Sequence, residues 1–282
     1  MHQKEQFMSQ EKMSQDRMAQ EGESASSNYE MKYYGFHACQ TLWLERPEDI
    51  IRAYIEPSKI KAFAALLKWC AQNKKAYHVV DNEAISRVTH STHHEGICLL
   101  VKERPPISFE EVLNKLQTMQ ETSTLVYLDG VEDPHNIGSI MRTAAYFGVE
   151  YIIGDMAKLP KMSPSAYRVA KGAGELVQLV PLRSPINAIN ALKSLGYELI
   201  ATSQKEDCHN VHEFEFRDKT ILVVGNETKG ISSEIENHAD EVINIRGSQK
   251  IESLNVSAAT AICLSEIWRC NHTNAASGNE SN

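Results

Sequence analysis

The chain has 282 residues, of which 42% are hydrophobic, so it is long enough for two domains with buried cores. No apolar run reaches the ~18 residues needed to cross a bilayer, and the N-terminus lacks the apolar segment of a signal peptide, so we expect a cytoplasmic protein without a membrane partner. The formal net charge of −8 does not exclude a nucleic-acid partner, because residues 31–107 hold eleven basic and eight acidic side chains, a local charge of +3.

The first part of the chain predicts a small α/β domain between residues 31 and 104. Residues 1–30 are polar and without periodicity, which favours disorder. After them, helical spacing of apolar residues alternates with strand-like runs. The expected helices are His37–Leu44 and Lys59–Asn73, and the expected strands are Ile50–Ile55, Ala76–Val80 and Ile97–Val101. Pro105 and Pro106 interrupt regular structure, so a hinge is expected there. Residues 105–122 are expected to contain the linker and a leading helix.

The second part, residues 123–270, alternates strand and helix more strongly. The strand-like runs are Leu125–Leu128, Tyr151–Ile153, Leu199–Ala201, Ile221–Val224 and Val242–Ile245. Such alternation predicts a mostly parallel sheet with helices on both faces. Ligands of open parallel sheets bind beyond the carboxyl ends of the strands, so the residues that follow each strand are the candidates for function. Residues 271–282 are polar and are again expected to be disordered.

The strand at Leu125–Leu128 is followed by the sequence DPHNIG, residues 133–138, and then by a helical pattern through Ala145. We expect this helix to begin near Ile137, which would place Arg142 in its first two turns, close to Asn136. A purely structural interpretation remains open, in which Asn136 caps the helix and Arg142 is solvated. Gly138 permits close approach of another backbone.

Two further strands are followed by distinctive loops. The sequence GNETKG, residues 225–230, follows Ile221–Val224 and suggests backbone amides that face a ligand; it is not a phosphate-binding loop, because no Lys-Ser or Lys-Thr follows its second glycine. The loop after Val242–Ile245 leads through Ser253 and Asn255, either of which could cap a helix over Ser257–Arg269. Small residues in that helix, Ala258, Ala259 and Ala261, suggest tight packing against a neighbouring helix, such as one of a second subunit.

In this order and at these strand ends, the three segments resemble the three motifs of the SpoU/TrmH family of RNA ribose 2′-O-methyltransferases, in the SPOUT superfamily. The matching positions are Asn136, Gly138, Arg142, Thr143 and Ala144 for the first motif, Gly225, Asn226, Glu227 and Gly230 for the second, and Ser253, Leu254, Asn255 and Val256 for the third. Residues 33–101, with the sequence HHEG at 93–96, resemble the family's substrate-binding domain, which has the fold of ribosomal protein L30e.

The resemblance implies a fold and an activity. Residues 123–270 would form a SPOUT domain with a deep trefoil knot that binds S-adenosylmethionine, and residues 31–104 an L30e-like domain that binds rRNA or tRNA. Two chains would form a homodimer through the C-terminal domain and complete the site across the interface. The implied catalytic residues are Arg142, Asn136, Glu227, Ser253 and Asn255, and the implied cofactor-binding residues are Gly225, Asn226, Gly230, Ile245, Leu254 and Thr202.

One segment departs from the family pattern. Family members usually carry Pro-Met after the last strand's isoleucine and a glycine two residues on, where this chain has Arg246, Gly247 and Gln249. An RNA-binding homodimer that has lost methyl transfer therefore stays open as an alternative. Nucleotide hydrolysis is not favoured, because the sequence contains no phosphate-binding loop.

Other polar groups allow only general interpretations. No cysteine or carboxylate spacing supports a metal site at His90, His93 and His94, which could instead touch RNA phosphate. Five lysines on or after one helix mark either a solvated face or an RNA contact: Lys59, Lys61, Lys68, Lys74 and Lys75. The six cysteines lack CxxC pairs and are expected to be reduced thiols, mostly buried.

Overall fold

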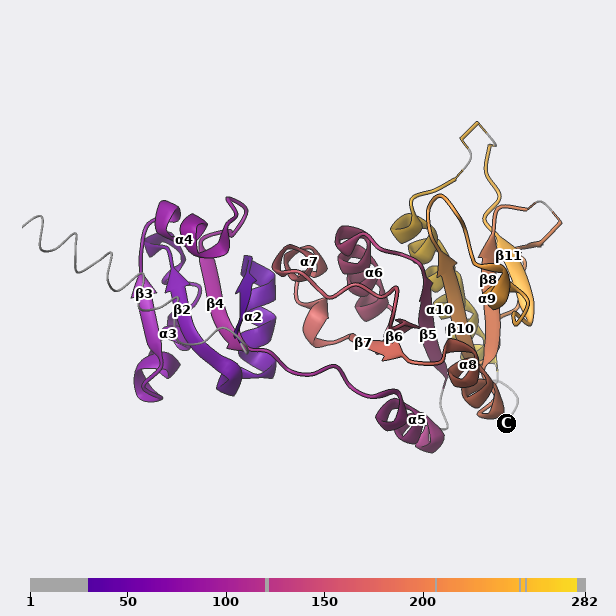
Figure 1. Cartoon of the computed structure of the whole chain (residues 1–282), viewed down its shortest axis with the longest axis horizontal. Coiled ribbons are helices and arrows are strands. Elements are labelled where there is room, and N and C mark those ends of the chain that lie inside the picture. The colour runs from indigo at the N-terminus through magenta and orange to yellow at the C-terminus, as the bar shows by residue number, and fades with distance from the viewer. Residues whose placement is uncertain (1–29, 120–121, 206, 249, 252, 278–282) are drawn as a thin grey trace, which may run out of the picture.

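The computed structural model describes residues 30–119, 122–205, 207–248, 250–251 and 253–277, and it places them in two domains joined by an extended segment (Figure 1). The N-terminal domain has a four-stranded sheet in the order β1-β4-β2-β3, in which β4 is antiparallel to β1 and β2, and β2 is parallel to β3. Its elements are β1 (Glu30–Tyr34), α2 (Phe36–Glu45), β2 (Ile50–Ile55), α3 (Ala64–Gln72), β3 (Ala76–Val79), α4 (Asn82–Thr89) and β4 (Ile97–Lys102).

This domain confirms the three predicted strands and adds elements that the pattern did not predict. Strand β1 begins at Glu30, inside the segment expected to be disordered; the remainder of that segment lies outside the described residues. The second helix begins at Ala64 rather than Lys59, because Pro57 starts a separate 3-10 turn, η2 (Pro57–Lys59). Helix α4 was also missed, although Asp81 caps it by accepting a hydrogen bond from the Ala84 amide at 2.8 Å.

The C-terminal domain is built on a seven-stranded sheet in the order β7-β6-β5-β10-β8-β11-β9, with every neighbouring pair parallel. Its strands are β5 (Ser123–Asp129), β6 (Tyr151–Asp155), β7 (Gln178–Leu182), β8 (Glu198–Ser203), β9 (His209–Asn210), β10 (Lys219–Gly225) and β11 (Glu241–Asn244). Its helices are α5 (Phe109–Thr118), α6 (Pro134–Tyr146), α7 (Pro164–Ala170), α8 (Pro185–Ser194), α9 (Ser233–Glu236) and α10 (Val256–Ser277), with a 3-10 turn η3 (Ala173–Glu175).

Helices cover both faces of this sheet, which explains its uninterrupted apolar strands. Along β10, Leu222 and Val224 pack with α6, α7 and α10, whereas Ile221 and Val223 face α5, α8 and α9. All four side chains are at most 1% exposed. Alternate residues of a strand point to opposite faces, so a strand buried on both faces reads as a continuous apolar run.

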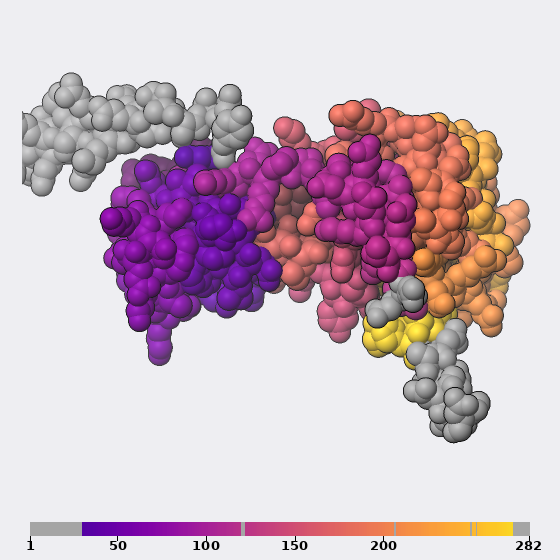
Figure 2. Space-filling model, turned by 90° about the horizontal axis from the view of Figure 1, so that it is seen from below, coloured from indigo at the N-terminus to yellow at the C-terminus, as the bar shows by residue number. Residues whose placement is uncertain are grey.

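The two domains touch through α2 and β1 on one side and α7 and η3 on the other (Figure 1). Figure 2 shows the coral segment around α7 and η3 pressed against the indigo N-terminal domain. Residues 103–107 have no regular structure, and α5 begins with a capping box in which Ser108 and Glu111 satisfy each other's backbone amides. Within the described ranges, no helix has the length and apolar character required to span a membrane.

Candidate active site

The carboxyl ends of β5 and β10 lie side by side, because Asp129 pairs with Gly225 in the parallel ladder. Two hydrogen bonds tie the loops that follow these strands. The Asp129 carboxylate, which is 4% exposed, accepts from the Ser232 amide at 2.6 Å, and the Asn226 side chain donates to the Gly130 carbonyl at 2.9 Å. Sequence reasoning gave Asp129 no role, although an acid directly at the end of a buried strand is a recognisable signal.

The loop after β10 is closed on itself. Asn226 and Gly230 exchange backbone hydrogen bonds of 3.1 and 2.9 Å, and the Asn226 side-chain oxygen accepts from the amides of Thr228 and Lys229. Gly225 is required by this closure, since a Cβ there would lie 2.6 Å from both the Gly230 carbonyl oxygen and the Ile231 nitrogen. The predicted glycine loop therefore exists, with Glu227 at its turn.

Helix α6 begins at Pro134, three residues before the predicted start. Asp133 caps it by accepting from the His135 amide at 2.9 Å, and Pro134 occupies the first helical position, where its missing N–H costs nothing. The expected helix start near Ile137 is therefore wrong, and Arg142 lies in the third turn rather than the first two; the open alternative in which Asn136 caps the helix is also excluded. Because Asp133 takes the capping role, the Asn136 side chain is available for other partners.

Asn136 joins the three predicted segments. Its amide nitrogen donates a short hydrogen bond to the Glu227 carboxylate, and its oxygen accepts from the Asn255 amide at 3.1 Å. Asn255, one of the two cap candidates, also caps α10 by accepting from the Ser257 amide at 3.0 Å and from the Ser257 hydroxyl at 2.6 Å. Residues that are 91 and 119 positions from Asn136 in the chain thus converge at one end of the sheet.

Gly138 is explained by packing between helices. A Cβ at this position would lie 2.6 Å from the Ala166 carbonyl oxygen and 3.2 Å from the Val169 Cβ. Helix α7 therefore approaches the backbone of α6 closely, as the glycine predicted. Gly138 therefore allows α7 to pack against α6, which carries Asn136, and does not itself contribute a polar group to the cluster.

The structure does not bring Arg142 to this cluster within one chain. Arg142 is exposed, and it forms no hydrogen bond or ion pair with any residue that the structure describes. It lies six residues after Asn136, which along an α-helix is about 9 Å and about 120° around the axis. One helix therefore carries the two side chains on different faces.

The remaining predicted residues border the same edge of the sheet. Ser253 and Leu254 are exposed, and Ile245 follows the end of β11. The Thr202 hydroxyl donates to the Val223 carbonyl at 3.0 Å, so its proton already has a partner. Arg246 and Gly247 are exposed, whereas Gln249 lies outside the described residues.

The histidines of the N-terminal domain do not form one group. His94 is fully buried, with its Nε2 3.1 Å from the Ser86 hydroxyl and its Nδ1 accepting from the Gly96 amide at 3.1 Å. This contradicts a phosphate contact for His94, while His90 and His93 are exposed. In the described parts of the chain, no three His, Cys, Asp or Glu side chains are grouped so that they could hold a metal ion.

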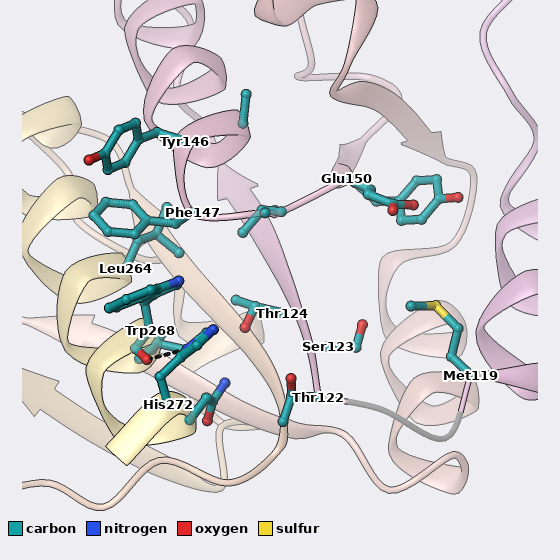
Figure 3. Close-up of a pocket in the computed structure, with 16 residues that line it drawn as sticks. Met119, Thr122, Ser123, Thr124, Tyr146, Phe147, Glu150, Leu264, Trp268 and His272 are labelled. Atoms are coloured by element: carbon teal, nitrogen blue, oxygen red, sulfur yellow. Dashed lines mark hydrogen bonds between the residues drawn. The ribbon is translucent and has the colours of Figure 1, made fainter. Parts of the chain in front are cut away.

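A hollow of about 390 Å³ lies at the other end of the sheet, where β5 begins, and none of the predicted site residues lines it (Figure 3). Figure 3 shows aromatic side chains from the end of α6 and from α10 around it. They include Tyr146, Phe147 and Trp268, whose ring stacks on His272 with centroids 4.0 Å apart. The polar cluster around Asn136 and this aromatic hollow are therefore separate features.

Two family models match the chain. The SpoU rRNA Methylase family matches residues 123–265, and RNA 2′-O ribose methyltransferase substrate binding matches residues 33–107. The chain is 32% identical over 242 residues to an uncharacterized tRNA/rRNA methyltransferase, YfiF, of Escherichia coli O157:H7, covering 86% of this chain and 69% of that relative. It is 29% identical over 237 residues to the 23S rRNA (guanosine-2′-O-)-methyltransferase RlmB of Bordetella pertussis, covering 83% and 95% of the two chains.

Solved structures share this fold. The SpoU methyltransferase AviRb from Streptomyces viridochromogenes, solved in complex with AdoMet, aligns with a TM-score of 0.71 and 21% identity, over 86% of this chain and 91% of that one. An AdoMet-bound rRNA methyltransferase from Sinorhizobium meliloti aligns with a TM-score of 0.67 and 23% identity, over 85% and 87%. Both alignments span the N-terminal and the C-terminal domain.

Proposed function

The chain belongs to the SpoU rRNA methylase family, and from this premise we propose that it transfers a methyl group from S-adenosylmethionine to a ribose 2′-hydroxyl of rRNA or tRNA. The observation that carries the proposal is Asn136, which hydrogen-bonds to both Glu227 and Asn255. Helix capping alone does not explain this cluster, since Asp133 caps α6. The cluster joins all three segments that resemble the family's motifs.

The loops after β10 and β11 leave groups uncovered that suit the cofactor. Ile251 and Leu254 are apolar side chains left 82% and 50% exposed, and nothing lies within 4 Å of a Cβ placed on Gly230 or Gly247. Cofactor sites are lined mostly by apolar side chains with a few backbone N–H and C=O groups, and these residues offer both kinds of group. The residues proposed to contact it are Gly225, Asn226, Gly230, Ile245, Leu254 and Thr202.

When bound, S-adenosylmethionine supplies an electrophilic methyl group on its sulfonium. A ribose 2′-hydroxyl is a weak nucleophile at neutral pH, so the protein must remove its proton and align it with that methyl group. Guanidinium scarcely deprotonates, so Arg142 is not a base. It holds the adjacent phosphate and stabilises the developing alkoxide while the proton passes to that phosphate. Asn136, Glu227, Ser253 and Asn255 orient the ribose and the arginine.

A homodimer through the C-terminal domain completes this site. On α6, His135, Arg142 and Tyr146 are exposed along one stripe with Ser139, and on α10 a second stripe follows the same three-and-four spacing. The members of the second stripe are Ala258, Ala261, Ser265 and Trp268. Tyr146 and Trp268, at the hollow in Figure 3, are 82% and 46% exposed and offer apolar area to a second chain. The partner subunit's Arg142 would then reach the Asn136 cluster.

The family also supplies the finer architecture that we propose. The C-terminal domain, residues 123–270, forms a deep trefoil knot in the segments after β10 and β11, and residues 31–104 form an L30e-like RNA-binding domain. Support for the division comes from the two family matches, at residues 33–107 and 123–265. Residues 105–122, which include α5, connect them.

The variant Arg142→Ala tests the proposed function. Methyl transfer to in vitro transcribed 23S rRNA and tRNA should be lost, while calorimetry still shows S-adenosylmethionine binding. Arg183→Ala is the matched control, because Arg183 is likewise exposed and follows β7, two strands from β5. Unchanged turnover in Arg142→Ala would contradict the assignment.

Arg246, Gly247 and Gln249 replace residues that family members usually carry after the last strand. This difference favours one second candidate function, an RNA-binding homodimer of the same fold without methyl transfer. Calorimetry with S-adenosylmethionine separates the two, since absence of binding to the unaltered chain supports this second candidate. Mapping of 2′-O-methylation in total RNA from a deletion strain would then identify the modified nucleotide.

A further inference from the structure

A buried ion pair connects the two domains. Arg46, directly after α2, donates from Nε to Glu175 Oε2 at 2.6 Å and from Nη2 to Glu175 Oε1 at 3.0 Å, and both side chains are 7% exposed. Its third nitrogen, Nη1, donates to the Asp49 carboxylate and to the Lys102 carbonyl, each at 3.2 Å. The guanidinium is thus held by its own domain on one edge and by the C-terminal domain on the other.

Two glycines near this ion pair allow the domains to approach closely, because a side chain at either position would collide with the other domain. Gly172, with a φ of +94°, faces Thr41, whose Cβ would lie 2.7 Å from a Cβ on the glycine. Gly35, with a φ of +96°, faces Arg168, whose Cγ would likewise lie at 2.7 Å. Each domain therefore contributes a glycine that receives a side chain of the other.

Aromatic packing fills the space between these contacts. Tyr33 of β1 and Tyr167 of α7 have ring centroids 4.4 Å apart, and Tyr33 is 1% exposed. The Arg46 guanidinium lies 5.6 Å from the centre of the Tyr33 ring, close enough for a cation–π contact. The interface thus combines apolar burial with directional hydrogen bonds.

A bidentate pair fixes orientation as well as distance, because both guanidinium N–H groups must face both carboxylate oxygens. The covalent connection alone does not fix it, since residues 103–107 have no regular structure. From Glu175 the contact continues through α7 to α6, whose backbones approach closely at Gly138, and α6 carries Asn136. A continuous series of packed elements therefore leads from the N-terminal domain to the candidate active site.

We propose that Arg46 and Glu175 are positioning residues, which hold the N-terminal domain against the C-terminal domain so that RNA bound by the first reaches the Asn136 cluster at a fixed distance. The role in catalysis rests on the proposed function, whereas the role in docking the domains does not. The hinge expected at Pro105 and Pro106 would operate only after this pair separates.

The test compares Glu175→Gln with Glu198→Gln in the full-length chain. Glu198 is a similarly buried carboxylate, 9% exposed, and pairs with the exposed Arg217 at 3.2 Å inside the C-terminal domain, so its loss changes stability without touching the interface. Small-angle X-ray scattering should show a larger radius of gyration for Glu175→Gln, because the buried Arg46 guanidinium loses its charged partner across the interface and keeps only Asp49, in its own domain. Glu198→Gln should scatter like the unaltered chain. Equal scattering of all three proteins overturns the docking role.

Kinetics test the catalytic part. For 23S rRNA transcribed in vitro, kcat/KM of Glu175→Gln should fall about tenfold or more, since only the docked fraction presents RNA correctly. Its affinity for S-adenosylmethionine should stay unchanged, and Glu175→Asp should recover part of the rate. An unchanged kcat/KM, or equal losses in Glu175→Gln and Glu198→Gln, overturns positioning. Absence of methyl transfer by the unaltered chain on any RNA instead refutes the proposed function, and the scattering comparison still decides docking.

Discussion

Replacing Gly225 with alanine is predicted to open the loop after β10 and to remove cofactor binding. The added Cβ would lie 2.6 Å from two backbone atoms, the Gly230 oxygen and the Ile231 nitrogen, whereas ordinary contacts begin at 3.4 Å. Backbone atoms cannot rotate away as the end of a side chain can, so the loop must move by nearly 1 Å. That movement breaks the paired hydrogen bonds of 3.1 and 2.9 Å between Asn226 and Gly230.

The cost follows from these contacts. Two backbone hydrogen bonds contribute about 1 kcal/mol each, and overpacking at a tight site costs about 1–3 kcal/mol. Allowing for partial relaxation of the loop, we expect Gly225→Ala to lower the free energy of unfolding by about 2–4 kcal/mol. For a domain of this size, that corresponds to a fall in Tm of roughly 5–15 °C.

Two other glycines of the site are matched controls. Nothing lies within 4 Å of a Cβ on Gly247, so Gly247→Ala should leave Tm unchanged. Gly230 also has open space but a φ of +68°, so Gly230→Ala should cost about 1–2 kcal/mol from backbone strain alone. Differential scanning calorimetry measures the series, and titration with S-adenosylmethionine measures binding. A Gly225→Ala protein as stable as Gly247→Ala would refute the steric reasoning.

Two further predictions concern the cluster and the thiols. Asn136→Ala leaves Glu227 and Asn255 without their shared partner. The free energy of unfolding should therefore fall by about 1–3 kcal/mol, and the rate of methyl transfer should fall by more than tenfold. An unchanged single-turnover rate would contradict the cluster's role. Burial raises the pKa of the Cys98 and Cys263 thiols in the folded protein to about 12. In the unfolded chain the same thiols ionise at about pH 8.5. The stability that the buried neutral thiols contribute is therefore complete below about pH 8.5 and is lost as the pH rises toward 12. Iodoacetamide at pH 8 should therefore modify the half-buried Cys208 first, as measured by peptide mass spectrometry, and equal modification of all three would contradict the burial argument.

The strands of the C-terminal sheet could be predicted because burial on both faces leaves a clear sequence pattern. Ile221–Val224 is such a run, and the structure places it in the central strand β10. Strand β7 was missed because it contains Pro181, which argues against a strand; the structure tolerates it because β7 is an edge strand. Strand β9 has two residues and offers no pattern.

Three of the residues that the sequence singled out, Asn136, Glu227 and Asn255, meet in one cluster, but their geometry was not predicted. The start of α6 was placed three residues too late, near Ile137, although Asp133 followed by Pro134 is a strong signal for a helix start. That Asn136, Glu227 and Asn255 belong to one site was predicted only from the resemblance to the family, since no local sequence pattern relates residues so far apart. The pair of Arg46 and Glu175, separated by 129 positions, gave no sequence signal at all.

If Arg142 acts at the Asn136 cluster, as proposed, its position on α6 predicts that a second chain supplies it to the site. Asn136 and Arg142 face about 120° apart on α6, so the helix offers Asn136 to its own cluster and Arg142 to the surface proposed to bind a second chain. Mixing Arg142→Ala chains with Asn136→Ala chains should therefore restore methyl transfer above the level of either variant alone, because each heterodimer holds one cluster with both residues intact. Random pairing gives half heterodimers with one working site of two, or about a quarter of the unaltered rate. If both residues served the same chain's site, no mixture would recover activity, and the assembly of the site across the dimer would be refuted.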